Sequence, residues 1–127
     1  MLKNISAAIL VLLLLNISAC AQKPSEDEIT VKQLHEKMET DSSLVILDVR
    51  NPDELVGELG QIEGVINIPL PVLEKRMNEL NKYKNNNIAV VCRSGRRSGI
   101  ATDLLNENGF KAKNILGGMI EYRKNEK

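Results

Sequence analysis

The regular alternation of short apolar runs with helical signals constrains the fold of this chain more than any other feature. Apolar runs lie at 44–47 and 88–91, further short strands are expected at 65–68 and 110–116, and the helical signals lie between and after them. The runs at 44–47 and 88–91 are unbroken, which is typical of strands covered on both faces of a parallel sheet. The sequence therefore predicts an α/β fold, with a parallel central sheet of about five strands and helices on both faces.

The expected helices begin with capping residues and present one apolar face. Thr30 followed by Gln33 matches a capping box, and the segment 51–54 has Asn, Pro and Glu at positions that suit a helix start. A helix is expected at 71–80, and another at 98–108 with Gly109 as its C-terminal cap. Four residues of the last helix are expected to face the core: Ile100, Ala101, Leu104 and Leu105.

The first 28 residues carry export signals. Lys3 precedes the apolar run Ala7–Leu15, which is shorter than the roughly 20 residues that a membrane span needs. Residues 17–20, Ile-Ser-Ala-Cys, resemble the lipobox of bacterial lipoproteins, in which the cysteine is lipidated. We therefore expect a lipoprotein signal peptide at 1–19, a lipidated tether at 20–28 and one domain at 29–127.

On this interpretation Cys20 carries the lipid and anchors the protein to the bacterial cell envelope, as an exported protein on the periplasmic or outer face. An ordinary signal peptide with an incidental cysteine, or an uncleaved anchor, is the alternative. The sequence has two cysteines, so acylation of Cys20 would leave Cys92 as the one free thiol. A leftover thiol in an exported protein indicates a reactive cysteine.

The composition argues against a nucleic-acid partner. The formal net charge is zero, and the chain has two Tyr, one Phe and no Trp. Nucleic-acid-binding domains usually carry a basic surface, and those for single strands add aromatic stacking platforms. No nucleic acid is therefore expected among the partners.

The strongest chemical signal is the segment Cys92–Ser98, Cys-Arg-Ser-Gly-Arg-Arg-Ser, between an expected strand and an expected helix. Ligands bind at the carboxyl ends of parallel strands, and a glycine-containing loop at a helix N-terminus presents N–H groups to an anion. The charges of Arg93, Arg96 and Arg97 would further lower the pKa of the Cys92 thiol. We expect a reactive thiolate here; the alternative is a buried core cysteine beside a solvated face of arginines.

Four segments in order make residues 29–127 similar to the rhodanese family. They resemble its D-x-R motif, its G-H-I-x-G-A-x-N-I-P segment, its six-residue active-site loop and its terminal G-G-x-x-x-W: Asp48–Arg50, Gly60–Pro69, Cys92–Arg97 and Leu116–Tyr122. The resemblance implies a rhodanese-like fold and a thiosulfate sulfurtransferase. The family's His is replaced by Gln61 and its Trp by Tyr122, and the stretch between Leu55 and Gly60 is about two residues longer than in the family.

The resemblance also implies the roles of the residues. The Cys92 thiolate takes a sulfane sulfur from a small anion such as thiosulfate, forms a persulfide, and passes the sulfur to cyanide or a thiol. Asp48 and Arg50 are expected to support the loop as a buried salt bridge. No metal and no organic cofactor are implied. The donor is expected to bind at six residues: Arg93, Ser94, Gly95, Arg96, Arg97 and Ser98.

Two rival functions stay open. Rhodanese-related phosphatases and arsenate reductases share the fold, but their loop places the arginine six residues after the cysteine, whereas Arg97 is five residues after Cys92. The second rival is a non-catalytic or relay module that binds a partner protein, delivers sulfur to it or senses oxidants through the thiol. His35, the only histidine, is expected on a solvent-facing helix surface, so no Cys–His pair is expected.

Overall fold

The structure is a computed structural model that describes residues 22–126. The expected signal peptide, the lipobox and Cys20 lie outside the described residues. Five parallel strands form one sheet in the order β1-β5-β4-β2-β3, and this confirms the expected parallel sheet of about five strands. The strands are β1 (Glu28–Ile29), β2 (Val45–Asp48), β3 (Ile66–Asn67), β4 (Asn87–Val91) and β5 (Lys111–Ile115).

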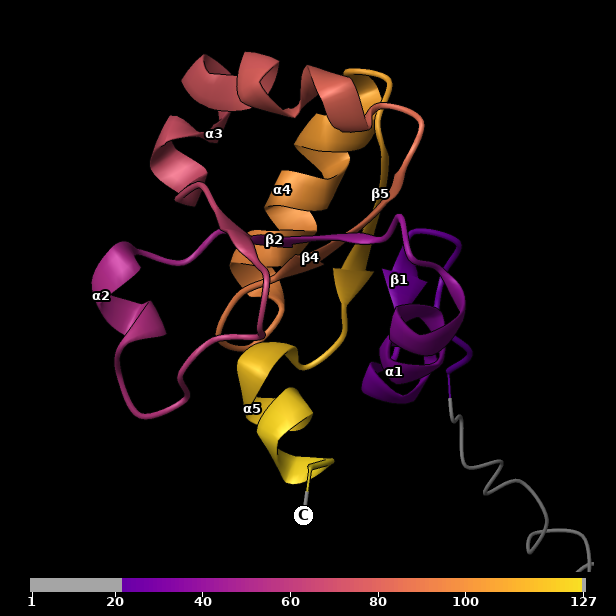
Figure 1. The fold of residues 1–127 in the computed structure, drawn as a ribbon, viewed down its shortest axis with the longest axis vertical. Helices are drawn as coiled ribbons and strands as arrows, with labels where there is room; N and C mark the ends of the chain where they lie inside the picture. Colours follow the sequence, from indigo (N-terminus) through magenta and orange to yellow (C-terminus); the bar gives the residue numbers. More distant parts are fainter. Residues whose placement is uncertain (1–21, 127) are drawn as a thin grey trace, which may run out of the picture.

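Helices cover both faces of the sheet, as the sequence predicts. They are α1 (Val31–Thr40), α2 (Pro52–Leu55), α3 (Leu70–Arg76), the 3₁₀ helix η1 (Met77–Tyr83), α4 (Arg96–Glu107) and α5 (Gly118–Lys124). In Figure 1, α3 and α4 lie above β2, and α1 and α5 lie below it. The described chain enters the sheet at β1, where Glu28 pairs with Asn114 of β5.

Alternate residues of the central strands fill two cores. Leu47 and Val90 pack in the core beneath α3, η1 and α4, whereas Ile46 and Ala89 pack in the core beneath α1 and α5. Side chains of neighbouring strand residues point to opposite faces of the sheet. An unbroken apolar run is thus what a strand buried on both faces requires, which explains why 44–47 and 88–91 are so apolar.

The expectation for α4 is wrong at Ile100, which is 53% exposed, whereas Ala101 and Leu105 are buried as expected. The buried face of α4 includes the polar residues Ser98 and Thr102. The Thr102 hydroxyl donates to the Ser98 carbonyl at 2.7 Å, so its polar group is satisfied inside the helix. This face places Ile100 on the opposite side of the helix.

Candidate active site

Cys92 follows β4 directly, at the carboxyl end of a strand in the middle of the sheet. Its side chain belongs to the core beneath α4, and the residue is 1% exposed. The loop 93–95 connects it to the first turn of α4, where open α/β sheets bind ligands. The sulfur is therefore buried, as the alternative of a core cysteine expects, and its hydrogen bonds bear on whether it can also react.

The carbonyls of the loop are held by the N-terminus of α5. The Cys92 carbonyl accepts from the Met119 N–H at 2.9 Å, and the Arg93 carbonyl accepts from the Ile120 N–H at 3.1 Å. Gly118 allows this approach, because a Cβ there would lie 2.5 Å from the Cys92 carbonyl oxygen. The sequence motif with two glycines thus serves to hold the cysteine loop against α5.

Gly95 turns the chain so that the loop's N–H groups face the sulfur. Its φ is +102°, a left-handed conformation that favours glycine. Its N–H donates to Cys92 Sγ at 3.1 Å, and α4 begins at the next residue. A loop of this shape at a helix N-terminus can present N–H groups to an anion, and anion binding here stays a prediction.

Hydrogen bonds set the pKa of the Cys92 thiol. Burial raises this pKa, but the hydroxyl of Ser98 and the backbone N–H groups of Ser98, Gly95 and Ser94 outweigh burial, so the pKa lies below its ordinary value. These hydrogen bonds, rather than the arginine charges emphasised from the sequence, are the main lowering causes. Cys92 therefore ionises more readily than an ordinary cysteine although the residue is buried.

Asn114 is a site residue that the sequence did not reveal. It lies on β5, next to β4. Its side-chain amide bridges Gly95 of the loop and Ser98 of α4. Its Oδ1 accepts from the Ser98 hydroxyl at 2.6 Å, and its Nδ2 donates to the Gly95 carbonyl at 3.1 Å. The Ser98 hydroxyl in turn lies 3.2 Å from Cys92 Sγ. The sequence shows only a polar residue in the expected strand at 110–116, and this does not single out Asn114.

The three loop arginines differ in their surroundings. Arg93 and Arg96 are exposed, and neither takes part in the ion pairs found within residues 22–126. Arg97 instead donates two hydrogen bonds of 2.8 Å to the carboxylate of Glu54 on α2. Arg97 is the largest cause that lowers the pKa of Glu54 from 4.5 to about 2. Two of the three expected donor-binding side chains are therefore free to meet an anion, while Arg97 is neutralised by Glu54.

Asp48 and Arg50 form the buried salt bridge that the sequence predicts, with Arg50 Nη2 2.7 Å from Asp48 Oδ2. Arg50 also donates to the backbone carbonyls of Glu54 and Gly60, at 3.2 and 2.7 Å. The pair therefore fixes the position of α2 and, through it, the carboxylate that holds Arg97. The salt bridge is confirmed, and its role in supporting the loop stays a prediction.

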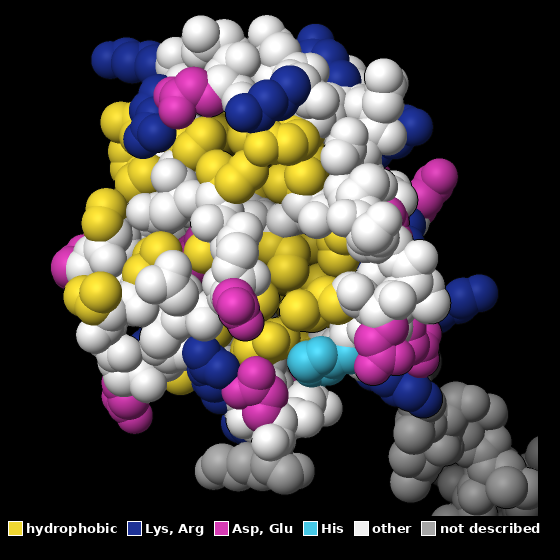
Figure 2. Space-filling model, viewed as in Figure 1, with side chains coloured by type: hydrophobic (Ala, Val, Ile, Leu, Met, Phe, Trp, Pro, Cys, Tyr) yellow, Lys and Arg dark blue, Asp and Glu magenta, His cyan; other side chains and the backbone are white. Residues whose placement is uncertain are grey.

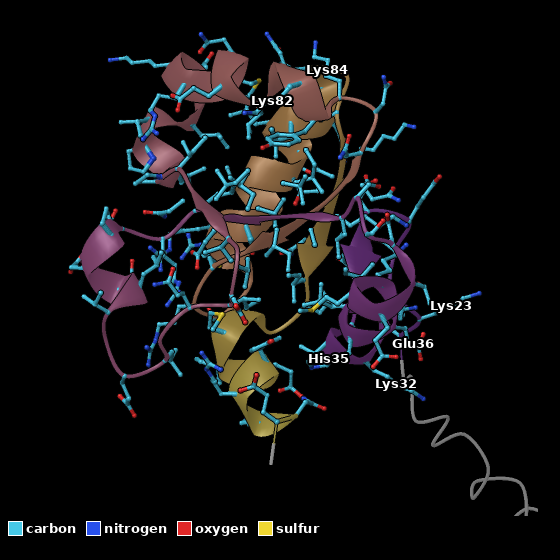
Figure 3. All side chains as sticks on the ribbon, in the orientation of Figure 1. Lys23, Lys32, His35, Glu36, Lys82 and Lys84 are labelled. Carbon is cyan, nitrogen blue, oxygen red and sulfur yellow. The ribbon has the colours of Figure 1, made fainter. Side chains whose placement is uncertain are left out.

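His35 is not simply solvent-facing. Figure 3 shows it on α1 beside α5, and its ring stacks on the Tyr122 ring with centroids 5.2 Å apart. Its Nε2 is buried without a hydrogen-bond partner. Tyr122 packs in the core beneath α1 and α5, whereas Cys92 packs on the other face of the sheet. His35 therefore belongs to the opposite side of the domain from the thiol.

Neither a metal centre nor a membrane span is found in the described part of the chain. Residues 22–126 contain no group of three or more His, Cys, Asp or Glu side chains placed to hold a metal ion. None of their helices has the length and apolar character to cross a membrane.

Figure 2 shows acidic and basic side chains intermixed on the visible face. The fold and the site define an α/β domain with a buried cysteine at the carboxyl end of a central strand, whose sulfur accepts hydrogen bonds from the loop that follows it.

Comparison with known proteins identifies the family. Residues 30–125 match the family described as Rhodanese-like domain. YtwF of Bacillus subtilis (strain 168), provisionally named a sulfurtransferase, is 39% identical over 95 residues, which cover 75% of this chain and 88% of YtwF. The crystal structure of SSP1007 from Staphylococcus saprophyticus subsp. saprophyticus is 33% identical with a TM-score of 0.68, and the match covers 76% of this chain and 92% of that one. The chain belongs to the rhodanese-like domain family.

A further relative is a longer protein. YrkF of Bacillus subtilis (strain 168), provisionally named a sulfur carrier protein, is 43% identical over 96 residues. The match covers 75% of this chain but 50% of YrkF, so the chain spans half the length of that relative. The family and its relatives' names support sulfur transfer as the broad function.

Proposed function

We propose that the protein is a sulfurtransferase in which Cys92 carries a sulfane sulfur from thiosulfate to cyanide or a thiol. The observation that carries the proposal is the environment of Cys92 Sγ, which receives the Gly95 N–H at 3.1 Å and lies 3.2 Å from the Ser98 hydroxyl. These groups favour a thiolate nucleophile, and the thiolate is the reactive form of cysteine.

In the first half-reaction, the Cys92 thiolate attacks the outer sulfur of thiosulfate. A bond forms between Sγ and that sulfur, the sulfur–sulfur bond of thiosulfate breaks, and sulfite leaves with the bonding electron pair. The product is a Cys92 persulfide with one negative charge. The N–H groups of the loop, with the exposed Arg93 and Arg96, are the groups available to bind the incoming anion and this persulfide.

In the second half-reaction, cyanide or a thiolate attacks the terminal sulfur of the persulfide. The new bond forms to the acceptor, the persulfide sulfur–sulfur bond breaks, and the electron pair returns to Cys92 as a thiolate. Because the enzyme alternates between a thiolate and a persulfide, the scheme is ping-pong and consumes no cofactor.

Loop length supports sulfur transfer over phosphate chemistry. Arg97, five residues after Cys92, is paired with Glu54, and the next position is the buried Ser98, whose hydroxyl faces the sulfur and Asn114. The loop thus lacks a free arginine at the sixth position to hold a tetrahedral oxyanion. A relay module that hands sulfur to a partner protein would use the same persulfide and differs in its acceptor.

The test is to incubate the full chain with thiosulfate, with and without cyanide. We expect a mass gain of one sulfur atom on the peptide that contains Cys92, and thiocyanate when cyanide is present. Cys92→Ser should abolish both products, and the matched variant Cys20→Ser should leave both unchanged. An adduct without turnover to cyanide would support the relay module, whereas no adduct with any sulfane donor would refute sulfur transfer. Cleavage of an aryl phosphate would support the phosphatase class.

We also propose that the protein is exported and lipid-anchored through Cys20, on the basis of the sequence pattern at 17–20. Growth of cells that express the chain with labelled palmitate should label the wild type and leave Cys20→Ala unlabelled. Label that persists in Cys20→Ala would refute the lipid anchor at this cysteine.

A further inference from the structure

Four hydrogen bonds form a closed ring around Cys92. Cys92 Sγ lies 3.2 Å from the Ser98 hydroxyl, which lies 2.6 Å from Asn114 Oδ1. Asn114 Nδ2 lies 3.1 Å from the Gly95 carbonyl, and the Gly95 N–H returns to Cys92 Sγ at 3.1 Å. The ring links the sulfur to the side chain of Asn114 on the neighbouring strand, β5. Asn114 itself makes no hydrogen bond to the sulfur and reaches it only through Ser98 and Gly95.

The donor and acceptor of each bond follow from the amide of Asn114. Its NH₂ group must face the Gly95 carbonyl, because two oxygens cannot share a hydrogen bond without a hydrogen, so its oxygen faces Ser98. A serine hydroxyl has a single hydrogen. When that hydrogen is donated to Asn114, the Ser98 oxygen is left to accept from the S–H of a Cys92 thiol.

Ionisation of Cys92 disturbs this order. A thiolate has no hydrogen to donate, and a buried anion needs donors. The backbone N–H groups of Ser94, Gly95 and Ser98 already donate to Sγ, and the Ser98 hydroxyl, 3.2 Å from Sγ, is the side-chain donor that can join them. On ionisation its hydrogen rotates from Asn114 to the sulfur. The Asn114 oxygen then loses its 2.6 Å bond. Cys92 and Asn114 therefore compete for one hydrogen.

We propose that Asn114 is a positioning residue that sets how readily Cys92 ionises, by competing for the hydroxyl hydrogen of Ser98. A role limited to holding the loop is a weaker account, because the Gly95 carbonyl also accepts from the Gly99 N–H at 3.1 Å and keeps a partner without Asn114. The inference deepens the proposed function, since sulfur transfer starts from the thiolate, but the ionisation of Cys92 is measurable without any sulfur donor.

The test measures the rate of alkylation by iodoacetamide against pH. The full chain carries Cys20→Ser, which leaves Cys92 as its one cysteine. Asn114→Ala frees the Ser98 hydroxyl for the thiolate, so we expect alkylation at pH 6 to be about three to ten times faster. Ser98→Ala removes the donor and should slow alkylation by a similar factor. In the double variant, Asn114→Ala should have no effect, because its route through Ser98 is gone.

A matched control separates this role from the packing of β5 on α4. Asn106 also bridges these elements, with its side chain donating to the Ala112 carbonyl at 3.0 Å and accepting from the Ala112 N–H at 2.8 Å. Within the described residues its side chain makes no hydrogen bond to Cys92, Ser98 or Asn114. Asn106→Ala should therefore lower the melting temperature while the alkylation profile stays unchanged. A profile that moves equally in both variants would overturn the proposal, as would an unchanged profile in Asn114→Ala.

A second measurement keeps the proposal falsifiable if Asn114→Ala does not fold. In the Cys20→Ser chain with Asn114 intact, the ¹³Cγ shift of the Asn114 amide should titrate with the same midpoint as the alkylation of Cys92, since its hydrogen bond is lost on ionisation. An amide signal that is constant across that midpoint would overturn the proposal. A chain that follows these predictions but forms no persulfide would count against the proposed function alone.

Discussion

The carboxylate of Glu54 and the guanidinium of Arg97 form two hydrogen bonds of 2.8 Å, which join α2 to the first turn of α4. The two residues are 43 positions apart in the chain. Glu54 also accepts from the Asn51 N–H at 2.9 Å, so the same carboxylate caps α2. The pair thereby connects α4, which follows the Cys92 loop, to α2, and it offsets one positive charge near the site.

Glu54→Gln tests whether the ion pair between Glu54 and Arg97 stabilises the folded domain. The side chains of Arg97 and Glu54 are 33% and 27% exposed, and solvent screening at such a site limits the loss to about 1 kcal/mol. For a domain of this size we expect a melting temperature about 4–8 °C lower at pH 7, measured by circular dichroism. Glu79→Gln is the control, because the Arg76–Glu79 pair is more exposed, at 41% and 49%. If the melting temperature falls as far in Glu79→Gln as in Glu54→Gln, the Glu54–Arg97 pair has no special stabilising role.

The same variant has a defined pH dependence. The pKa of Glu54 falls from 4.5 to about 2 in the folded protein. A depressed carboxyl pKa gives stability that is fully present above pH 4.5 and is lost as the pH falls through 2. The melting temperatures of the wild type and Glu54→Gln should therefore differ above pH 4.5 and converge near pH 2. A constant difference across this range would show that the carboxylate charge is not the cause.

Gly118→Ala tests the contact between the cysteine loop and α5. An added Cβ would lie 2.5 Å from the Cys92 carbonyl oxygen, and the φ of +57° would strain any other residue. We expect a loss of about 2–5 kcal/mol, as the sum of backbone strain and forced displacement of the loop, and slower alkylation of Cys92. The measurements are urea unfolding and the alkylation rate at pH 7.

Gly64→Ala is the matched control for the backbone strain. Its φ is +79°, but nothing lies within 4 Å of an added Cβ, so the expected loss is about 1–2 kcal/mol with no change in the alkylation rate. Equal effects of the two variants on Cys92 would mean that the close approach at Gly118 has no bearing on the thiol.

The fold could be predicted because its signals are local. An apolar run covered on both faces, or Thr30 with Gln33 at a helix start, needs no knowledge of distant residues, and the capping box at Thr30 is present as expected. The inward position of Ile100 failed because apolar spacing favoured it over Ser98 and Thr102. Those two polar residues are buried, and the Thr102 hydroxyl is satisfied by the Ser98 carbonyl within the same helix.

The parts of the site that are short local motifs could be predicted as well, whereas the contacts between distant segments could not. The loop from Cys92 and the Asp48–Arg50 pair are short motifs, and both lie where the sequence placed them. Glu54 and Asn114 acquire their contacts only when distant segments meet, 43 and 16 residues from their partners Arg97 and Ser98. No spacing rule links such pairs in a single sequence. The neutralisation of Arg97 by Glu54 could therefore not be foreseen.

The buried pair of Asp48 and Arg50 gives the last prediction. Both side chains are at most 1% exposed, so Arg50→Met leaves the Asp48 carboxylate buried beside Arg50's former position without its cation. We expect this single change to cost about 3–5 kcal/mol, measured by urea unfolding. Asp48→Leu should cost a similar amount, because it leaves the Arg50 guanidinium without its carboxylate.

The double variant Asp48→Leu/Arg50→Met should be more stable than either single variant, because no unpaired charge remains in the core. Part of the loss should persist, since Arg50 also donates to the carbonyls of Glu54 and Gly60 and those oxygens would lose a donor. If the double variant loses the full sum of the two single losses, the carbonyl contacts and not the charge pair dominate the role of Arg50. In that case Arg50 stabilises the domain mainly by holding α2 and Gly60 in place.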